Sequence, residues 1–184
     1  TGYAEAITPL ASVITDQVNE IQLEAIDAEL SFFLVEPVPT KKRVALVVEV
    51  RTEGRAPAAF ELGPLAVWPK PVPVELVDAL LQAVDDDNKK VRIEAIYSLG
   101  TIGSPATVKL SEAATARLLK ALDHYDPAVR AGAARVVGRL QVKSAGDALL
   151  KAVNDSNAEV RYASIRALGE IDDERAVQAL TEQL

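Results

Sequence analysis

Val160-Arg-Tyr-Ala-Ser-Ile-Arg-Ala-Leu-Gly169 decides the fold, because the same pattern occurs twice earlier in the chain. The earlier copies are Val91-Arg-Ile-Glu-Ala-Ile-Tyr-Ser-Leu-Gly100 and Val129-Arg-Ala-Gly-Ala-Ala-Arg-Val-Val-Gly138. Each copy follows a turn rich in Asp and Asn, whose side chains accept the first amide hydrogens of a helix. Small and branched apolar residues then recur at helical spacing up to a glycine, which suits a helix end or a tight helix contact. We call this predicted element helix B.

A second apolar helix, helix A, is predicted before each of these turns. Its Leu-Leu-x-Ala core recurs in register within residues 77–84, 115–122 and 146–153. The unit is therefore a helix–turn–helix pair, and one pair cannot bury its apolar face alone. Neighbouring pairs are expected to stack into a mainly α superhelix, an α-solenoid.

The unit resembles the HEAT repeat, in the short form of the phycobilin-lyase-like HEAT subgroup. The resemblance is carried by Asp126-Pro-Ala-Val-Arg130 and by the Val-Arg-x-Ala-x-x-x-Ala-Leu-Gly string at 160–169. It covers residues 74–184 well and 3–35 weakly, and it leaves 36–73 outside. In HEAT-like arrays, arginines at the second motif position commonly pair with an aspartate of a neighbouring turn. The resemblance thus implies a structural ladder that joins Arg92, Arg130 and Arg161 to aspartates such as Asp87, Asp126 and Asp155.

Three segments follow from this pattern. Residues 1–35 are expected to form a degenerate first repeat, because a shift of 70 residues places Ile21 on Val91. In that alignment Gln22 replaces the motif arginine and Leu30 replaces the glycine. Residues 74–184 hold repeats two to four and, at 172–184, the first helix of a fifth repeat. Residues 36–73 between them are an insertion.

The insertion predicts a β-hairpin. Residues 43–52 are rich in β-branched side chains, Glu53-Gly54 follows as a turn, and 58–65 read as a returning strand. A two-stranded hairpin alone is marginal in water, so it must lie on the solenoid, meet a second copy or accept a partner strand. A structural flap and a recognition or dimerisation element are both consistent with the sequence.

Composition restricts the function classes. The formal net charge of −7 argues against nonspecific nucleic-acid binding, which needs a basic face. The chain has no cysteine, and it lacks the run of about 18 apolar residues that a membrane span requires. It begins with Thr1 rather than Met, which suggests a cut or processed product. The compartment cannot be assigned.

The candidate binding surface is a stripe on the B helices. Positions two, six and ten after the motif valine share one helix face, away from the buried Val, Ala and Leu positions. In the three repeats these positions hold Ile93, Tyr97 and Thr101, then Ala131, Arg135 and Arg139, then Tyr162, Arg166 and Glu170. Tyr and Arg often anchor protein interfaces. The predicted partner-binding residues are therefore Tyr97, Arg135, Arg139, Tyr162 and Arg166, facing an acidic or carboxylate-bearing segment. The alternative is an ordinary solvated face with pairs such as Arg166–Glu170.

No metal, cofactor or catalytic site is predicted. His124, the single histidine, is interpreted as a loop residue near a helix start. Residues 85–87 and 172–174 are acidic, but they lack the glycine and spaced ligands of a calcium loop and fit turns and caps.

Three functions remain open on the sequence. The first is a non-enzymatic scaffold that binds another protein through the concave helix-B face and the inserted hairpin. The second is a bilin lyase-like subunit or chaperone, which the resemblance suggests. Such a protein handles an acidic tetrapyrrole, which the arginines of the stripe would suit. The third is a self-assembling structural protein, at its simplest a homo-dimer. Neither nucleic acid nor a membrane is an expected partner.

Overall fold

The structure, a computed structural model, describes residues 4–34 and 70–175. Its α-helices are α1 (Ala4–Ala11), α2 (Asn19–Phe33), α5 (Val74–Ala83), α6 (Lys89–Ile102), α7 (Glu112–Ala121), α8 (Pro127–Arg139), α9 (Gly146–Ala152) and α10 (Ala158–Glu170). Two 3-10 turns, η1 (Ser12–Thr15) and η2 (Lys143–Ala145), extend α1 and precede α9.

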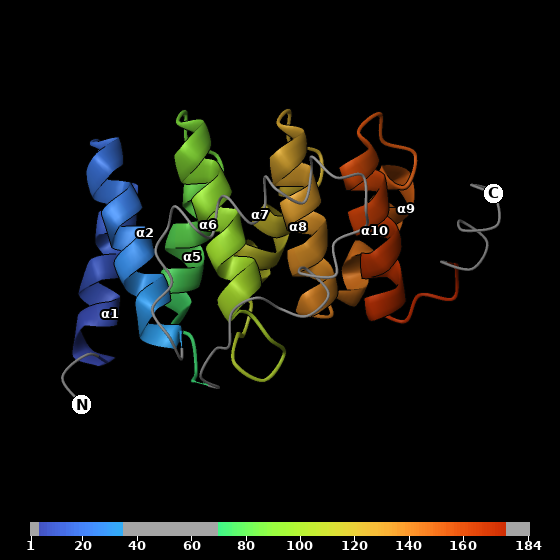
Figure 1. Ribbon diagram of the computed structural model, residues 1–184. Helices are drawn as coiled ribbons and strands as arrows, with labels where there is room; N and C mark the ends of the chain where they lie inside the picture. Colours follow the sequence, from blue (N-terminus) through green and yellow to red (C-terminus); the bar gives the residue numbers. More distant parts are fainter. Residues whose placement is uncertain (1–3, 35–69, 176–184) are drawn as a thin grey trace.

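The helices form two layers, as Figure 1 shows. Helices α2, α6, α8 and α10 follow one another in one layer, and each packs on the next. Helices α1, α5, α7 and α9 form the second layer behind them, and each packs on the partner that follows it in the chain. This arrangement confirms the predicted α-solenoid, with the first layer made of B helices and the second of A helices.

The predicted β-hairpin lies within residues 35–69, which are outside the described residues. Residues 4–34 and 70–175 contain no β-strand. Most of the predicted first helix of a fifth repeat, 176–184, is also outside the described part of the chain. The division of the chain at residues 35 and 73 stays a prediction.

The core lies between the two layers. The motif valines Val91, Val129 and Val160 are fully buried, as are Leu118 and Leu149 of the A helices. Burying one such side chain contributes about 1.5–3 kcal/mol, so the repeated positions supply the main driving force for stacking.

The turns begin each B helix in the predicted way. Asn88, Asp126 and Asn157 are the N-cap residues of α6, α8 and α10, and each side chain accepts an amide hydrogen of the first turn. Two residues beyond the ends of α8 and α10, the backbone is left-handed at Gln141 (φ 54°) and Asp172 (φ 58°). These residues lie three positions beyond the motif glycines, so the glycines do not end the helices.

Gly138, the motif glycine of α8, instead allows close contact with the next B helix, α10. A Cβ on Gly138 would lie 2.8 Å from the Cα of Ala167 in α10. A Cβ on Gly132, earlier in α8, would lie 2.8 Å from side-chain carbons of Ile96 in α6. Real Cβ atoms do not approach carbon this closely, so helix α8 needs glycine on both of its flanks.

Gly138→Ala is expected to lower the free energy of unfolding by about 1–3 kcal/mol, because the added methyl group must push α8 away from α10. Gly169→Ala is the matched control. Gly169 has the same position in α10, and a Cβ there would meet nothing within 4 Å. The control should therefore stabilise the chain by about 0.5–1 kcal/mol through helix propensity. Urea unfolding of both variants checks the prediction, and equal effects of the two changes would contradict it.

Candidate functional site

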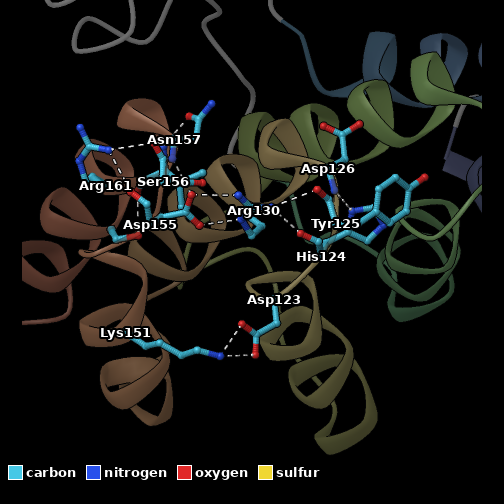
Figure 2. A network of polar contacts seen from close by, with 12 residues as sticks. Asp123, His124, Tyr125, Asp126, Arg130, Lys151, Asp155, Ser156, Asn157 and Arg161 are labelled. Atoms are coloured by element: carbon cyan, nitrogen blue, oxygen red, sulfur yellow. Dashed lines mark hydrogen bonds and ion pairs between the residues drawn. The ribbon is translucent and has the colours of Figure 1, made fainter.

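Two of the second-position arginines, Arg92 and Arg130, join neighbouring repeats through ion pairs that have little exposure to solvent. Arg92 donates from Nη2 to Oδ2 of Asp126 at 2.9 Å, from α6 to the turn before α8. Arg130 binds Asp155 with two hydrogen bonds, Nε to Oδ2 at 2.7 Å and Nη2 to Oδ1 at 2.9 Å. Figure 2 shows this second pair. The two pairs confirm the predicted arginine ladder at these positions.

The prediction that Asp87 belongs to the ladder was wrong. Asp86 takes the place in the second repeat, and its Oδ2 accepts a hydrogen bond of 2.9 Å from Nε2 of Gln22. The reason is register: Asp86 and Asp155 both lie five residues before their motif valine, and both accept the amide hydrogen two residues later. Gln22 thus continues the ladder to the first helix pair with a neutral donor.

Each motif arginine also holds the turn of its own repeat. Nη1 of Arg92 donates to the carbonyl oxygens of Asp86 and Asp87, and Nη1 of Arg130 donates to those of His124 and Tyr125. Arg161 makes the same two bonds to Asp155 and Ser156. Its guanidinium contacts no carboxylate within ion-pair distance in the described part of the chain.

The Arg92–Asp126 pair is the most deeply buried contact of the ladder, since the two side chains are 5% and 7% exposed. Burial pushes the pKa of Asp126 upward, but hydrogen bonds from Arg92 and from the Ala128 amide outweigh it and hold the pKa below 3.8. The ring of Tyr125 lies 5.1 Å from the Arg92 guanidinium carbon and shields it from one side. Asp126 is therefore ionised at neutral pH and fixes a charge inside the array.

His124 occupies the ladder position of the third repeat, where the second and fourth repeats have Asp86 and Asp155. Its Nδ1 accepts the amide hydrogen of Asp126 at 3.0 Å, so the imidazole replaces a carboxylate as the acceptor of the turn. Burial lowers the pKa of His124 below 6.5, despite nearby Asp85, which raises it. The predicted loop histidine near a helix start is confirmed, with a defined structural role.

A second set of ion pairs runs along the exposed edge of the A helices. Lys120 in α7 pairs with Asp85 at 2.9 Å, and Lys151 in α9 pairs with Asp123 at 2.8 Å. Both pairs are largely exposed to solvent, so each contributes little to stability.

The five predicted partner-binding residues lie on three adjacent B helices. Tyr97 (α6) is half-buried against the core, whereas Arg139 (α8), Tyr162 and Arg166 (α10) are exposed. Arg135 (α8) is half-buried and pairs with Glu159 at 2.8 Å. The predicted stripe also contained Ala131, and this part was wrong, because Ala131 is fully buried. Ala131 lies two helical turns before Gly138, and so on the face of α8 that packs against α10.

The exposed cations of the stripe differ in their partners. Arg166 pairs with Glu170 at 2.8 Å, and this hydrogen bond raises the pKa of the Arg166 guanidinium. Arg139 donates from Nε to the carbonyl oxygen of Gly103 at 2.9 Å, and no described carboxylate lies within ion-pair distance of it. The stripe therefore keeps one exposed guanidinium that no described carboxylate neutralises, and Tyr162 on the next B helix is 40% exposed.

Glu29 was not singled out from the sequence. It lies in α2, eight residues after Ile21, where the other B helices place Leu99, Val137 and Leu168. Its side chain is 1% exposed, and neither carboxylate oxygen has a hydrogen-bond partner among the described residues. Burial raises the pKa of Glu29 from 4.5 to about 8. Its register position is the signal that could have revealed a buried carboxyl group.

The described residues contain no cluster of three His, Cys, Asp or Glu side chains that could hold a metal ion. Within the same ranges, no helix is both long and apolar enough to cross a membrane.

Comparison with known proteins identifies the repeat. The family model for HEAT repeats matches residues 45–116 and 115–184, which together exceed half of the chain. The first match begins at residue 45, inside the segment 36–73, where the sequence motifs show no resemblance to the repeat. No curated protein matches the chain significantly.

Several solved structures share the fold. An engineered protein is 19% identical with a TM-score of 0.57, and the match covers 96% of this chain and 67% of that one. A designed armadillo repeat protein in complex with the peptide (KR)4 is 16% identical with a TM-score of 0.55, over 96% of this chain and 69% of that one. A second designed armadillo repeat protein is 20% identical with a TM-score of 0.56, over 97% and 71%. At these identities the likeness establishes the helical-repeat fold alone.

Proposed function

The chain belongs to the HEAT repeat family, and on that premise we propose that it is a non-enzymatic scaffold that binds a partner protein along its B helices. Repeat folds of this kind commonly mediate protein–protein interaction. The observation that carries the proposal is the exposed Arg139 guanidinium, which no carboxylate of the described residues neutralises, with Tyr162 and Arg166 exposed on the next B helix. The inserted segment 36–73 is a second candidate for contact with the partner protein, and this role is supported by its sequence alone.

The proposed partner segment is acidic. A carboxylate can bind the open donors of Arg139 directly, and it can compete with Glu170 for Arg166 because that pair is partly exposed. Tyr162 adds a large amphipathic contact at low cost in side-chain entropy. The designed armadillo neighbour was solved with the basic peptide (KR)4, and the arginines here favour the opposite charge.

Binding of a fluorescent peptide with alternating Glu and Leu tests the proposal, with (KR)4 as the peptide of opposite charge. Arg139→Glu combined with Arg166→Glu is expected to weaken binding of the acidic peptide by about tenfold or more, because both cations become repulsive. Arg117→Glu is the matched control, since Arg117 is exposed on α7 in the other layer.

Fluorescence anisotropy at low salt measures the affinities, and thermal melts confirm that the variants fold. The proposal fails if the double variant binds as tightly as the parent chain. It also fails if the Arg117 control weakens binding equally, since the effect would then reflect net charge and not the stripe.

A further inference from the structure

Helix α2 lies at one end of the array. The acceptor of the contact that joins neighbouring repeats is present there, but its donor is missing among the described residues. Asp16 lies five residues before Ile21, in the register of Asp86 and Asp155, and its Oδ1 accepts the amide hydrogen of Val18 at 2.8 Å. The other oxygen of Asp86 binds Gln22, and that of Asp155 binds Arg130, each from the preceding B helix. Asp16 is exposed, and its Oδ2 has no partner in the described residues.

The same end exposes apolar side chains. Ile21 is 43% exposed and Val18 is 46% exposed. The motif valines in the register of Ile21 are all fully buried, and each of those repeats has a preceding helix pair beside it. The α2 end thus resembles an interior surface of the array from which one neighbour is missing.

Helix α10, at the opposite end of the row in Figure 1, presents the other half of this contact. Arg161 holds its own turn, as Arg92 and Arg130 do, but it contacts no described carboxylate. Gly169 has nothing within 4 Å of a Cβ, whereas the equivalent Gly138 lies against Ala167 of the next B helix. The α10 end therefore has an unused donor and an open position for a small residue.

We propose that copies of this chain stack end to end, with the α10 end of one copy against the α2 end of the next. In the stack, Arg161 donates to Asp16 of the next copy, as Arg130 donates to Asp155 within one chain. Gly169 then faces Ala28 of the next copy, because Ala28 lies seven residues after Ile21 as Ala167 lies seven after Val160. The interface joins two different surfaces, so it propagates into a chain or closes into a ring.

Charge favours contact between an α10 end and an α2 end over contact between two α2 ends. Residues 4–34 contain six acidic residues and no Lys or Arg, so two α2 ends repel each other. The next copy's α1 would take the position that the sequence assigns to the first helix of a fifth repeat. Stacking must displace that segment, and for this reason we expect weak, concentration-dependent association. Tyr162 and Arg166 of the stripe lie in the registers of Ala131 and Arg135, which face the following B helix, so stacking covers this part of the stripe.

Sedimentation equilibrium of the full chain, from about 10 µM to about 1 mM, tests the proposal. The mean mass is expected to rise with concentration. Asp16→Arg blocks the α2 end by repelling Arg161, and Gly169→Trp blocks the α10 end by filling its open position. Each variant alone should associate at least tenfold more weakly than the parent chain. A mixture of the two should form a one-to-one dimer and nothing larger, since each keeps one intact end.

Circular dichroism melts verify that both variants fold. Asp16→Asn keeps an acceptor for the Val18 amide while it removes the charge, and it replaces Asp16→Arg if that variant unfolds. A parent chain that stays monomeric over the whole range overturns the proposal. So does a mixture that stays monomeric, or a single variant that associates like the parent chain.

Discussion

Asp126→Asn is expected to lower the free energy of unfolding by about 3–5 kcal/mol, the typical cost of removing one partner from a buried ion pair. The change leaves the Arg92 guanidinium 5% exposed without its carboxylate, and Nε of Arg92 already lacks a partner. Asparagine keeps the helix cap, because Asn88 and Asn157 cap the equivalent helices. The loss therefore reports the ion pair alone, and chemical denaturation measures it.

Two variants make this result specific. Asp126→Ala also removes the cap of α8 and should cost about 1 kcal/mol more than Asp126→Asn. Lys120→Ala breaks an exposed ion pair and should change stability by less than about 1 kcal/mol. A small effect of Asp126→Asn, comparable with that of Lys120→Ala, would show that the ladder does not stabilise the array.

Glu29→Leu is expected to stabilise the chain, and the gain should grow as the pH rises. The folded chain keeps the Glu29 proton up to a pKa of about 8, whereas the unfolded chain releases it near 4.5. Between these values the folded state binds more protons, so stability falls as the pH rises through this window. Leucine restores the residue type that Leu99 and Leu168 provide at the same position, and it removes this loss.

The expected gain above pH 8 is on the order of 5 kcal/mol, since each pKa unit corresponds to about 1.4 kcal/mol. Glu29→Gln should also remove the pH dependence but gain less, because it leaves a buried amide without partners. Glu24→Gln, at an exposed position of the same helix, is the control for loss of a carboxylate. Unfolding at pH 5, 7 and 9 checks the prediction, and a gain from Glu29→Leu that does not change with pH would contradict it.

Periodicity predicted the repeat and the layer of B helices, because the same side chains recur at the same register. The resemblance to HEAT repeats implied the arginine ladder, and two of its expected contacts are present. The Asp87 prediction failed where three consecutive aspartates, 85–87, offered neighbouring choices. Counting back from the motif valine would have selected Asp86, in line with Asp155. The pairing of Gln22 with Asp86 shows that the ladder persists where the arginine is lost.

The environment of single side chains could not be predicted in the same way. The helical period placed Ala131 in the stripe, but Ala131 shares the face of Gly138 that packs against α10 and is fully buried. The structure contains the Arg166–Glu170 pair that helical spacing suggested as the alternative to a binding face, and it adds the pair of Arg135 with Glu159. The second pair joins two repeats, and its formation depends on side-chain rotamers that periodicity does not encode.

Gln22 has a consequence for how the array transmits load. In a linear array each helix pair contacts only its neighbours, so a pulling force passes through every junction in series. The junctions after α6 and α8 are held by charged arginine pairs, whereas the junction between α2 and α6 has an amide donor in that position. In the Gln22–Asp86 hydrogen bond only the acceptor is charged, whereas both partners are charged in each arginine pair, so the arginine pairs are the stronger contacts. A chain stretched from its ends is therefore expected to separate first between α2 and α6. The first helix pair would then detach while the following three described pairs stay stacked.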